Sequence, residues 1–507
     1  MSDKISYSCH GDIAILTVQN PPVNALSQPV RQGLWDGMDR AEAEQGIRAI
    51  MIVGEGRAFF AGADITEFGK PPLKPHLPDL INRIESSPLL IVASMHGVSL
   101  GGGLEVALGC HYRIAVPTAC VGLPEVHLGL LPGAGGTQRL PRLAGVIAAL
   151  ELMTTGRHVD AEEGHKLGII DKIQDGDPNL NGIAYTQKLL DQNTPRRPAS
   201  DMPAPEKINW DEAFEKALKS GRGQISPAWC VRAVQASVEK PFEEGLEAER
   251  QIFYDLMQTE QRQGMIHAFF SQRAVSNLPE LKGITPRPLK NIALIGGGTM
   301  GAGIATSALL SGLNVTVLEM NKHATQAAFD RIENNLSGAK KRGKIDSQQY
   351  ENIVNHSLNL VTDYGKLSDM DLVIEAVFEE MAVKKRVFEE LDRICKPGTI
   401  LASNTSYLDI NEIAASTSRP ADVLGLHFFS PAHVMKLLEV VVADATAPDV
   451  AATGFALGKT LGKISVRAGV CDGFIGNRIL STYRAAADHM ILDGASPFEI
   501  DKALEEF

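Results

Sequence analysis

Two glutamates in the first third of the chain stand among apolar and glycine residues, an unusual setting for a carboxylate. Glu105 ends the run His96–Glu105, in which a strand pattern passes through a glycine turn into the start of a helix, and Glu125 lies ahead of a second glycine turn within Gly122–Arg139. Burial shifts carboxyl pKa values, so two such groups at one site can act as an acid and a base. Taken singly, the glycine triplet indicates only a tight turn, and Glu125 a solvated loop residue.

A second group of residues could bind a dinucleotide. The predicted strand Asn291–Ile295 runs into the predicted helix Thr299–Ser311. The glycines of this segment fit the GxGxxG pattern: Gly296, Gly298 and Gly301. Such glycines let the backbone approach a pyrophosphate at a helix N-terminus. Glu319 ends the next predicted strand, where a carboxylate binds ribose hydroxyls and repels a 2′-phosphate, so the sequence predicts an NAD site rather than an NADP site.

A histidine in the same half could serve as a proton acceptor. His427 lies in Gly425–Pro431, just past a predicted strand. Removing a hydride from a secondary alcohol needs a base for the hydroxyl proton. A lone histidine after a strand is usually structural, but Met435–Glu439 can return as an adjacent strand and place Glu439 against the imidazole. A carboxylate in that position holds the tautomer and raises the basicity of the ring.

The elements that must position the first pair of glutamates alternate between short strands and helices. A helix is predicted over Gln28–Ala43, and strands over Ile13–Val18, Ile47–Val53, Leu89–Ala93 and Tyr112–Val116. A Pro-rich stretch, Thr194–Pro205, predicts an exposed loop, and Asp211–Ser276 is mostly helical in pattern. We therefore expect an α/β core with later helices packed back on it.

The best linker in the chain is Asn277–Pro288, which contains three prolines and a glycine. It divides a first domain, 1–276, from a second, 289–472, whose βαβ pattern predicts a parallel sheet. Further strands are expected at Leu372–Glu375, Thr399–Ala402 and Leu424–Phe428. Residues 473–507 predict two helices, the last with an apolar stripe that has no later sequence to pack on: Ile500, Ala503, Leu504 and Phe507.

Composition excludes several classes of partner. The 507 residues carry 49 Lys and Arg against 61 Asp and Glu, a formal net charge of −12 that argues against a nucleic-acid or anionic-membrane partner. The apolar stretch Leu89–Cys110 is broken by His96, Glu105 and several glycines, so no membrane span is predicted. Six scattered cysteines form no CxxC pair, which predicts neither disulfides nor a metal site and favours a reducing compartment over secretion.

The segments Phe60–Ile65, His96–Glu105 and Leu123–Arg139 together resemble the crotonase (enoyl-CoA hydratase/isomerase) superfamily, over about residues 5 to 275. The resemblance implies a ββα spiral core with C-terminal helices and an acyl-CoA thioester as substrate, so that coenzyme A enters as part of that substrate. It implies an oxyanion hole from the backbone N–H groups of Ala63 and Gly102. It also implies that Glu105 activates water and Glu125 handles the α-proton, with isomerisation as a side activity.

Residues 290–507 resemble the L-3-hydroxyacyl-CoA dehydrogenase family, through the glycine pattern, the segment around His427, Ser403–Ser406 and Asp472–Arg478. The resemblance implies a Rossmann-type domain followed by the start of an all-helical domain. It makes His427 the base and Glu439 its partner. The resemblance also implies that Ser406 and Asn477 contact the substrate and that Glu379 and Lys384 line the cofactor site. The sequence departs from the family at Ser430, where Asn often follows HFF.

The order of the two halves resembles the multifunctional enzymes of fatty-acid β-oxidation, closest to the peroxisomal type 1 form and its bacterial relatives. The resemblance implies hydration of 2-trans-enoyl-CoA followed by oxidation to 3-oxoacyl-CoA, in a peroxisome or in bacterial cytoplasm. The family's helical domain continues beyond residue 507, so we expect a truncated chain that binds NAD but oxidises 3-hydroxyacyl-CoA inefficiently. Two alternatives are an isomerase-dominant enzyme and a non-catalytic fragment that binds CoA esters or a thiolase partner.

Overall fold

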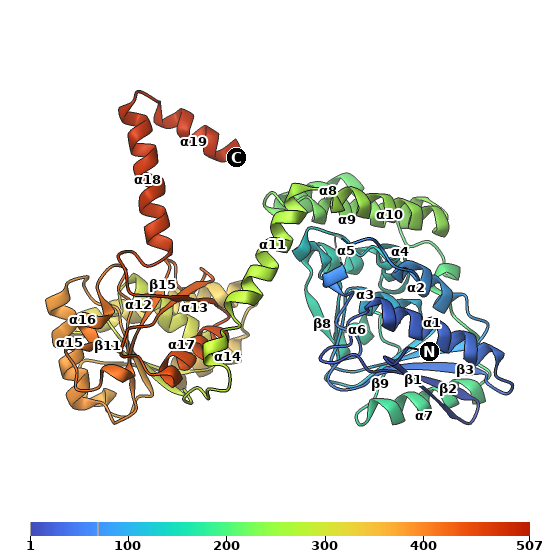
Figure 1. Cartoon of the computed structure of the whole chain (residues 1–507), viewed down its shortest axis with the longest axis horizontal. Helices are drawn as coiled ribbons and strands as arrows, with labels where there is room; N and C mark the ends of the chain where they lie inside the picture. The colour runs from blue at the N-terminus through green and yellow to red at the C-terminus, as the bar shows by residue number, and fades with distance from the viewer. Residues whose placement is uncertain (1, 68–69, 507) are drawn as a thin grey trace. The chain divides into compact units, whose positions relative to one another are not determined.

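The computed structural model describes residues 2–67 and 70–506. The chain divides into two compact units, unit 1 up to Phe269 and unit 2 from Phe270 onward (Figure 1). Each unit has its own sheet and its own hydrophobic core. Within the described part of the chain, no helix has the length and apolar character needed to cross a membrane.

Unit 1 is built on a six-stranded sheet with the order β1-β2-β3-β4-β6-β9. β1 and β2 are antiparallel, and the other neighbours are parallel. β3 and β4 are buried along their whole length, as expected for strands covered on both faces. The strands are β1 (Ile5–His10), β2 (Ile13–Val18), β3 (Ala49–Gly54), β4 (Leu90–Met95), β6 (Tyr112–Ala115) and β9 (Lys172–Ile173).

A small second sheet and a set of helices complete unit 1. The sheet has the order β5-β7-β8, from β5 (Val98–Leu100), β7 (Cys120–Gly122) and β8 (His158–Asp160). The helices are α1 (Gln28–Ala43), α2 (Leu77–Glu85), α3 (Gly102–Gly109), α4 (Gly136–Ala144), α5 (Val146–Thr155), α6 (Ala161–Lys166), α7 (Pro178–Asp191), α8 (Trp210–Gly221), α9 (Ser226–Glu239), α10 (Phe242–Met257) and α11 (Glu260–Val275). The predicted helix at 28–43 and the helical region after residue 210 are confirmed.

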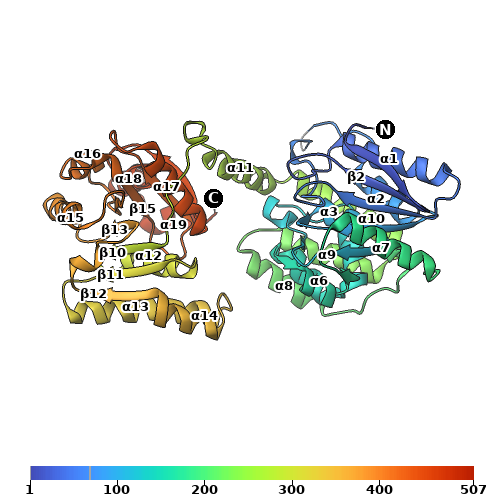
Figure 2. The same ribbon diagram turned by 90° about the horizontal axis from the view of Figure 1, so that it is seen from below.

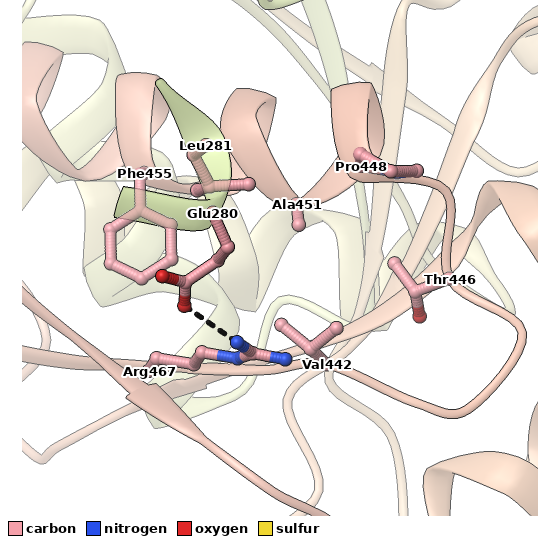
Figure 3. Close-up of a pocket in the computed structure, with 8 residues that line it drawn as sticks. All are labelled: Glu280, Leu281, Val442, Thr446, Pro448, Ala451, Phe455 and Arg467. Carbon is pink, nitrogen blue, oxygen red and sulfur yellow. Dashed lines mark hydrogen bonds and ion pairs between the residues drawn. The ribbon is translucent and has the colours of Figure 1, made fainter. Parts of the chain in front are cut away.

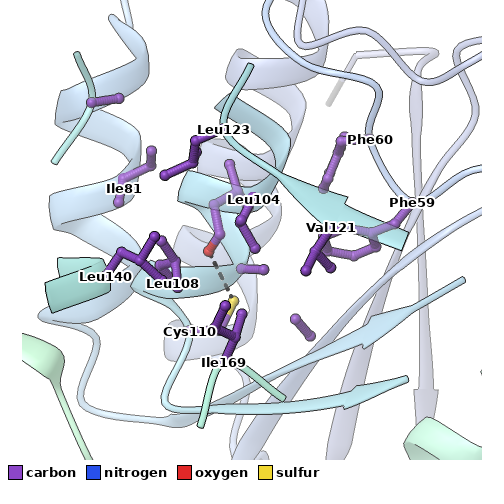
Figure 4. Close-up of a cluster of buried hydrophobic side chains, with 14 of the residues drawn as sticks. Phe59, Phe60, Ile81, Leu104, Leu108, Cys110, Val121, Leu123, Leu140 and Ile169 are labelled. Carbon is purple, nitrogen blue, oxygen red and sulfur yellow. Dashed lines mark hydrogen bonds between the residues drawn. The ribbon is translucent and has the colours of Figure 1, made fainter. Parts of the chain in front are cut away.

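Helix α3 runs through the centre of the unit 1 core, and every one of its residues is buried. Leu104 and Leu108 lie among Phe60, Ile81 and other apolar side chains drawn in Figure 4. A polar residue on such a helix is shielded from bulk solvent. Because Glu105 belongs to α3, the fold carries its carboxyl into the interior, where an ionisable group needs partners.

The Pro-rich stretch 194–205 is irregular and exposed or partly exposed at every residue except Ala199, as predicted, and hydrogen bonds also hold it against unit 1. Tyr112 Oη donates to Pro195 O at 3.0 Å, and Arg196 Nη1 donates to Ser87 O at 2.6 Å. The short 3₁₀ turn Ala199–Asp201 buries Ala199. The stretch is therefore tied to the unit 1 core by backbone carbonyls, which composition alone does not indicate.

Unit 2 contains an eight-stranded sheet with the order β12-β11-β10-β13-β14-β15-β16-β17. All neighbours are parallel except β15 and β16, which are antiparallel. The strands are β10 (Asn291–Ile295), β11 (Asn314–Leu318), β12 (Leu358–Val361), β13 (Leu372–Glu375), β14 (Ile400–Ser403), β15 (Val423–Phe428), β16 (Leu437–Val441) and β17 (Ile464–Ala468). The chain leaves β10 in one direction and returns on its other side at β13, which makes the carboxyl end of β10 a topological switch point.

Helices cover both faces of this sheet (Figures 1 and 2). One core cluster joins α12 (Thr299–Leu310), α13 (Lys322–Lys341) and α17 (Pro448–Thr460) to one face. Another joins α15 (Met381–Ile394) and α16 (Ile410–Ala414) to the other face. Ile292 and Leu294 point to the first cluster and Ala293 and Ile295 to the second, as the alternation of a strand requires.

The segment predicted as a linker contacts unit 2 through a short 3₁₀ turn, Pro279–Leu281. Glu280 pairs with Arg467 of β17 at 2.6 Å, and Leu281 lines a small pocket beside α17 together with Phe455 (Figure 3). Further along, Arg287 forms ion pairs at 2.8 Å with carboxylates of Asp422 and Asp449. This segment therefore lies bound along unit 2.

The predicted pair of C-terminal helices is confirmed as α18 (Gly476–Leu492) and α19 (Pro497–Glu506). Neither has a buried residue within the described part of the chain. Leu504 of the predicted apolar stripe is exposed, and Phe507 lies outside the described residues. α14 (Ser347–Asn352), which packs against α13, is the remaining α-helix of unit 2 in the described ranges.

Candidate active sites

Glu105 is held by the backbone of the glycine turn that opens α4. Its Oε1 accepts hydrogen bonds from Ala134 N at 2.7 Å and Gly136 N at 2.8 Å. Its Oε2 accepts none from the described residues. Burial raises the pKa of Glu105, while the two N–H donors and the charges of Arg139 and Arg250 oppose that rise. The carboxyl is thus fixed by one oxygen and leaves the other available.

Glu125 starts a 3₁₀ turn, Glu125–Leu128, and approaches the backbone just before α3. A Cβ on Gly101 would lie 2.9 Å from Glu125 Oε1, and Gly101 has φ +54°, so only glycine suits this position. Glu125 Oε2 is shielded from solvent and has no hydrogen-bond partner among the described residues. Burial, then the charges of Glu105 and Glu249, raise the pKa of Glu125 well above its ordinary value. This shift favours the protonated form of the Glu125 carboxyl.

The two backbone N–H groups predicted to form an oxyanion hole lie close together. A Cβ on Gly102 would be 3.4 Å from Ala63 N. Gly102 is the first residue of α3, so its N–H has no partner within the helix. A β-bridge between Leu26 and Ala63 fixes the segment that carries Ala63. The structure therefore brings Ala63, Gly102 and the region of Glu125 to one end of α3.

The glycine turn of unit 2 fits a dinucleotide. A Cβ on Gly301 would lie 1.8 Å from Gly296 O, so α12 can approach β10 only if residue 301 is glycine. A Cβ on Gly298 would meet nothing within 4 Å, which leaves the open side of the turn to a ligand. Glu319 lies across this turn, with Oε1 accepting from Gly297 N at 2.6 Å. The turn, the start of α12 and a strand-end carboxylate together form the predicted arrangement at the switch point.

His427 and Glu439 face each other across the antiparallel pair β15 and β16, at directly opposed positions. His427 lies within β15 rather than past its end. Its Nδ1 is 2.7 Å from Glu439 Oε2, and both side chains are buried. Glu439 Oε1 accepts from Gly476 N at 2.7 Å and from Ile475 N at 3.2 Å. A proton on Nδ1 therefore leaves the Nε2 lone pair free to accept another.

Lys384 lies in a buried network at the carboxyl ends of β13 and β14. Its Nζ is 2.7 Å from Glu375 Oε1 and 3.2 Å from Glu379 Oε2. Ser403 Oγ donates to Glu375 Oε2 at 2.7 Å, and Thr405 Oγ1 donates to Glu379 Oε1 at 2.5 Å. Burial raises the pKa of Glu379, but the hydrogen bond from Thr405 and the charge of Lys384 outweigh it and lower the pKa. Lys384 is thus a buried, doubly paired cation.

The two predicted substrate contacts lie at the ends of these networks. Ser406 donates its backbone N–H to Glu379 Oε1 at 2.7 Å and is half-buried. Asn477 is the second residue of α18, next to the Gly476 N–H that holds Glu439. Asn404 Oδ1 accepts from Phe428 N at 2.8 Å, which links the Ser406 loop to the strand of His427.

Two buried carboxylates were missed by the sequence analysis. Glu375 has no exposed surface and binds both Lys384 and Ser403. Glu249, on α10, binds the same turn as Glu105. A carboxylate at the end of an apolar strand was a usable signal for Glu375, because strands of a parallel sheet are covered on both faces. Nothing in the α10 sequence separates Glu249 from its exposed neighbours Glu243 and Glu244.

Two family models match the chain. Residues 9–193 match the enoyl-CoA hydratase/isomerase family, and residues 291–471 match the NAD-binding domain of 3-hydroxyacyl-CoA dehydrogenase. The peroxisomal bifunctional enzyme of Danio rerio is 44% identical over 505 residues, which cover 98% of this chain and 69% of that one. This chain belongs to the family of bifunctional β-oxidation enzymes. Its human relative of the same name is 42% identical, over 98% of this chain and 70% of the human one.

A plant relative extends the family. The glyoxysomal fatty acid beta-oxidation multifunctional protein MFP-a of Brassica napus is 37% identical, over 98% of this chain and 71% of its own. The predicted fold class is confirmed: a crotonase-like part, a Rossmann-type parallel sheet and then helices. Also confirmed are the activity class, enoyl-CoA hydratase with NAD-dependent 3-hydroxyacyl-CoA dehydrogenase, and NAD with CoA thioesters as its ligands. The roles of individual residues stay predictions.

Proposed function

We propose that unit 1 hydrates 2-trans-enoyl-CoA to (3S)-3-hydroxyacyl-CoA with Glu105 as base and Glu125 as acid. The observation that carries this assignment is the unequal hydrogen bonding of the two carboxyls. Glu105 receives two backbone N–H donors, which stabilise its ionised form, whereas the shielded Glu125 Oε2 receives none and its pKa is far above normal. Two neighbouring carboxyls with separated protonation states supply a base and an acid at one pH.

In the reaction, Glu105 takes a proton from water while the water oxygen bonds to C3. The C2=C3 electron pair moves toward the thioester carbonyl, and Glu125 delivers its proton to C2. The carbonyl oxygen gains negative charge on the way, and the N–H groups of Ala63 and Gly102 bind it. Each such donor contributes about 3 kcal/mol in a site that excludes water. The proton taken by Glu105 then returns to Glu125 through solvent, so the site is restored.

We propose further that His427 is the base of the second step, in unit 2. Its Nε2 accepts the proton of the C3 hydroxyl, and Glu439 keeps the opposite ring nitrogen protonated and the ring oriented. NAD, when bound, accepts the hydride that leaves C3. Ser406 and Asn477 hold the substrate hydroxyl and thioester region, and Glu379 and Lys384 line the cofactor side.

A coupled assay tests both steps at once. Crotonyl-CoA is added to the protein, loss of the enoyl thioester absorbance reports hydration, and NADH formed after addition of NAD reports oxidation. We expect the enoyl absorbance to fall first and NADH to form after it, at the low rate that the sequence analysis predicts for the oxidation step. In D₂O, deuterium should enter C2 of 3-hydroxybutyryl-CoA, and Glu125→Gln should abolish this incorporation while a control, Glu247→Gln on the exposed face of α10, keeps it. Full incorporation in Glu125→Gln would show that another group protonates C2.

The finer surroundings of the enzyme are also proposals. The relatives are named peroxisomal or glyoxysomal, which supports a peroxisomal location if the chain comes from a eukaryote. For a bacterial source we propose the cytoplasm. The 3-oxoacyl-CoA product is a thiolase substrate, so we propose a thiolase as partner. Co-sedimentation with a purified thiolase, and the distribution of a fluorescent fusion, test the two statements separately.

We also propose four segments: a hydratase domain at 1–276, a linker at 277–288, an NAD-binding domain at 289–472 and the helices 473–507. The change from helix α11 to irregular backbone near residue 276 supports the first boundary. Limited proteolysis followed by mass spectrometry should cut first between 276 and 279, because the chain beyond Pro279 is bound along unit 2.

A further inference from the structure

Four consecutive backbone N–H groups, those of residues 134–137, alternate between two carboxylates. Ala134 N and Gly136 N donate to Glu105, at 2.7 and 2.8 Å. Gly135 N and Thr137 N donate to Glu249, at 2.7 and 3.0 Å. The two carboxylates therefore bind the same turn. If one of them moves, its N–H donors move with it, and these lie next to the donors of the other carboxylate.

Glu249 comes from α10, far along the chain from the turn that it binds. It is 1% exposed, and its Oε2 also accepts the hydroxyl proton of Thr137 at 2.6 Å. Helix α4 begins at this turn with Gly135 as its N-cap, which has no side chain to cap the helix. Glu249 thus does for α4 what a capping residue usually does, and places a negative charge at the positive end of the helix.

The charged groups around Glu249 come from every element that packs on it. Glu105 of α3 and Glu125 of the 3₁₀ turn add negative charge, and Cys230 of α9 lies within electrostatic range. Arg250 of α10 adds positive charge at Glu249, and Arg139 of α4 adds positive charge at Glu105. Burial, then the charge of Glu105, raise the pKa of Glu249 to about 7. The charge of Glu249 in turn raises the pKa of Glu125.

We propose that Glu249 is a positioning residue of the hydratase site, which fixes the 134–137 turn and thereby the orientation of Glu105. The inference rests on the proposed role of Glu105 as base. Glu249 touches neither substrate nor water in this assignment, and it acts through the turn and through its charge. A second consequence follows from the charge: it favours the protonated form of Glu125, the form that the proposed reaction uses.

The test compares Glu249→Gln with Glu247→Gln, a control on the same helix whose side chain is exposed. The glutamine amide presents N–H groups where Thr137 N and Oγ1 donate, so the turn loses acceptors without losing volume. For Glu249→Gln we expect kcat for crotonyl-CoA hydration to fall about tenfold to a hundredfold, with KM within about twofold, because geometry at Glu105 is disturbed while substrate contacts remain. Glu247→Gln should match the wild type.

The pH profile separates this role from a merely structural one. Loss of the Glu249 charge lowers the pKa of Glu125, so the alkaline limb of the kcat/KM profile, which reports the acid, should move to lower pH by about 0.5 to 1 unit. Glu249→Asp keeps the charge and should restore the wild-type alkaline limb, even where the shorter side chain leaves kcat reduced. An alkaline limb that stays in place in Glu249→Gln, or kcat within twofold of the wild type, would overturn the proposal.

Two further measurements keep the outcomes distinct. If Glu249→Gln fails to fold, Thr137→Ala removes only the hydroxyl donor to Glu249, and we expect a smaller fall in kcat, about threefold to tenfold; unchanged kcat and an unchanged alkaline limb there would refute the proposal. Glu105→Gln is assayed beside them. Retained hydration in Glu105→Gln would contradict the proposed function itself, whereas an inactive Glu105→Gln beside a fully active Glu249→Gln would contradict only the role of Glu249.

Discussion

The two units fix their proton-transfer groups by different means. In unit 1, backbone N–H groups of a glycine-rich turn hold Glu105, so the partner is main chain and has no side chain to change. In unit 2, the carboxylate of Glu439 holds His427 across two strands, so the partner is itself a side chain. The first arrangement depends on the shape of a turn, and the second on strand register and on one residue.

The largest effect that separates the two units is expected from the substitution Glu105→Gln. A glutamine there can still accept the two N–H groups through its amide oxygen, so the turn should survive while the base is lost. We expect kcat/KM for crotonyl-CoA hydration to fall about 10³-fold, and oxidation of 3-hydroxybutyryl-CoA by NAD to stay unchanged. Separate steady-state assays of the two reactions measure both effects. If Glu105→Gln lowered both activities to the same extent, the two sites would not work independently of each other.

The matching change in unit 2 is His427→Asn. It removes the Nε2 lone pair but keeps a polar group beside Glu439, and we expect oxidation of 3-hydroxybutyryl-CoA to fall about 10²- to 10³-fold. Hydration of crotonyl-CoA should remain at the wild-type rate. NADH production measured over a range of substrate concentrations separates kcat from KM. Oxidation that persists at more than a tenth of the wild-type rate would mean that another group accepts the hydroxyl proton.

A histidine of unit 1 extends the comparison to stability. His111 is fully buried between backbone groups: Ile91 N donates to its Nδ1 at 2.9 Å, and Nε2 lies 3.1 Å from Glu85 O. Burial lowers the pKa of His111 to about 4. Between pH 6.5 and 4 the unfolded chain therefore binds a proton that the folded chain refuses, so stability falls as the pH falls, by about 3 kcal/mol for this group alone.

Buried carboxyls of unit 1 have raised pKa values and change stability with pH in the opposite sense, so the wild type alone does not show the effect of His111. The difference in stability between the wild type and His111→Asn isolates it. At pH 7 the wild type should have a larger free energy of unfolding than the variant. This difference should be smaller at pH 4.5 and should decrease steadily between the two pH values. Urea unfolding followed by circular dichroism at each pH measures the gap. A gap independent of pH would mean that His111 is protonated equally in both states.

The smallest effect is expected at Glu439. Its replacement by glutamine leaves an acceptor for either His427 or Gly476 N, though not for both with full strength. We expect oxidation to fall about tenfold, less than in His427→Asn, with hydration unaffected. The two variants are compared by the factor by which each lowers the oxidation rate. If Glu439→Gln lowers it as much as His427→Asn does, the carboxylate does more than orient the ring.

The sequence predicted the central strands of the unit 2 sheet because their signals are local. The strands Asn291–Ile295, Asn314–Leu318 and Leu372–Glu375 begin and end where their apolar runs do, and glycine spacing marks the turn between. The approach of Glu439 to His427 was also accessible, because two strands joined by a short connection have few registers. The small sheet β5-β7-β8 was missed, since strands of three residues carry too little pattern.

The unit 1 site could be predicted only in part. Glu105 and Glu125 stand out by their apolar surroundings, but the donors that distinguish the two carboxyls come from the tertiary path of the chain. Glu249 reaches the turn from more than a hundred residues away, on a helix whose other glutamates face solvent. Periodicity places a residue on a helix face, yet it does not tell which face meets a turn of another segment. Long-range contacts of this kind need coordinates.

The hydrogen bonds from residues 134–137 to Glu105 and Glu249 limit where the phosphates of CoA can bind. A glycine-rich segment opening a helix is ordinarily a good trap for phosphate, since its amides point outward in a cluster. Here all four of those amides already face protein carboxylates, and a phosphate would meet two negative charges instead of free donors. The pantetheine pyrophosphate and the ribose phosphate must therefore find their counter-charges on other surfaces of the chain.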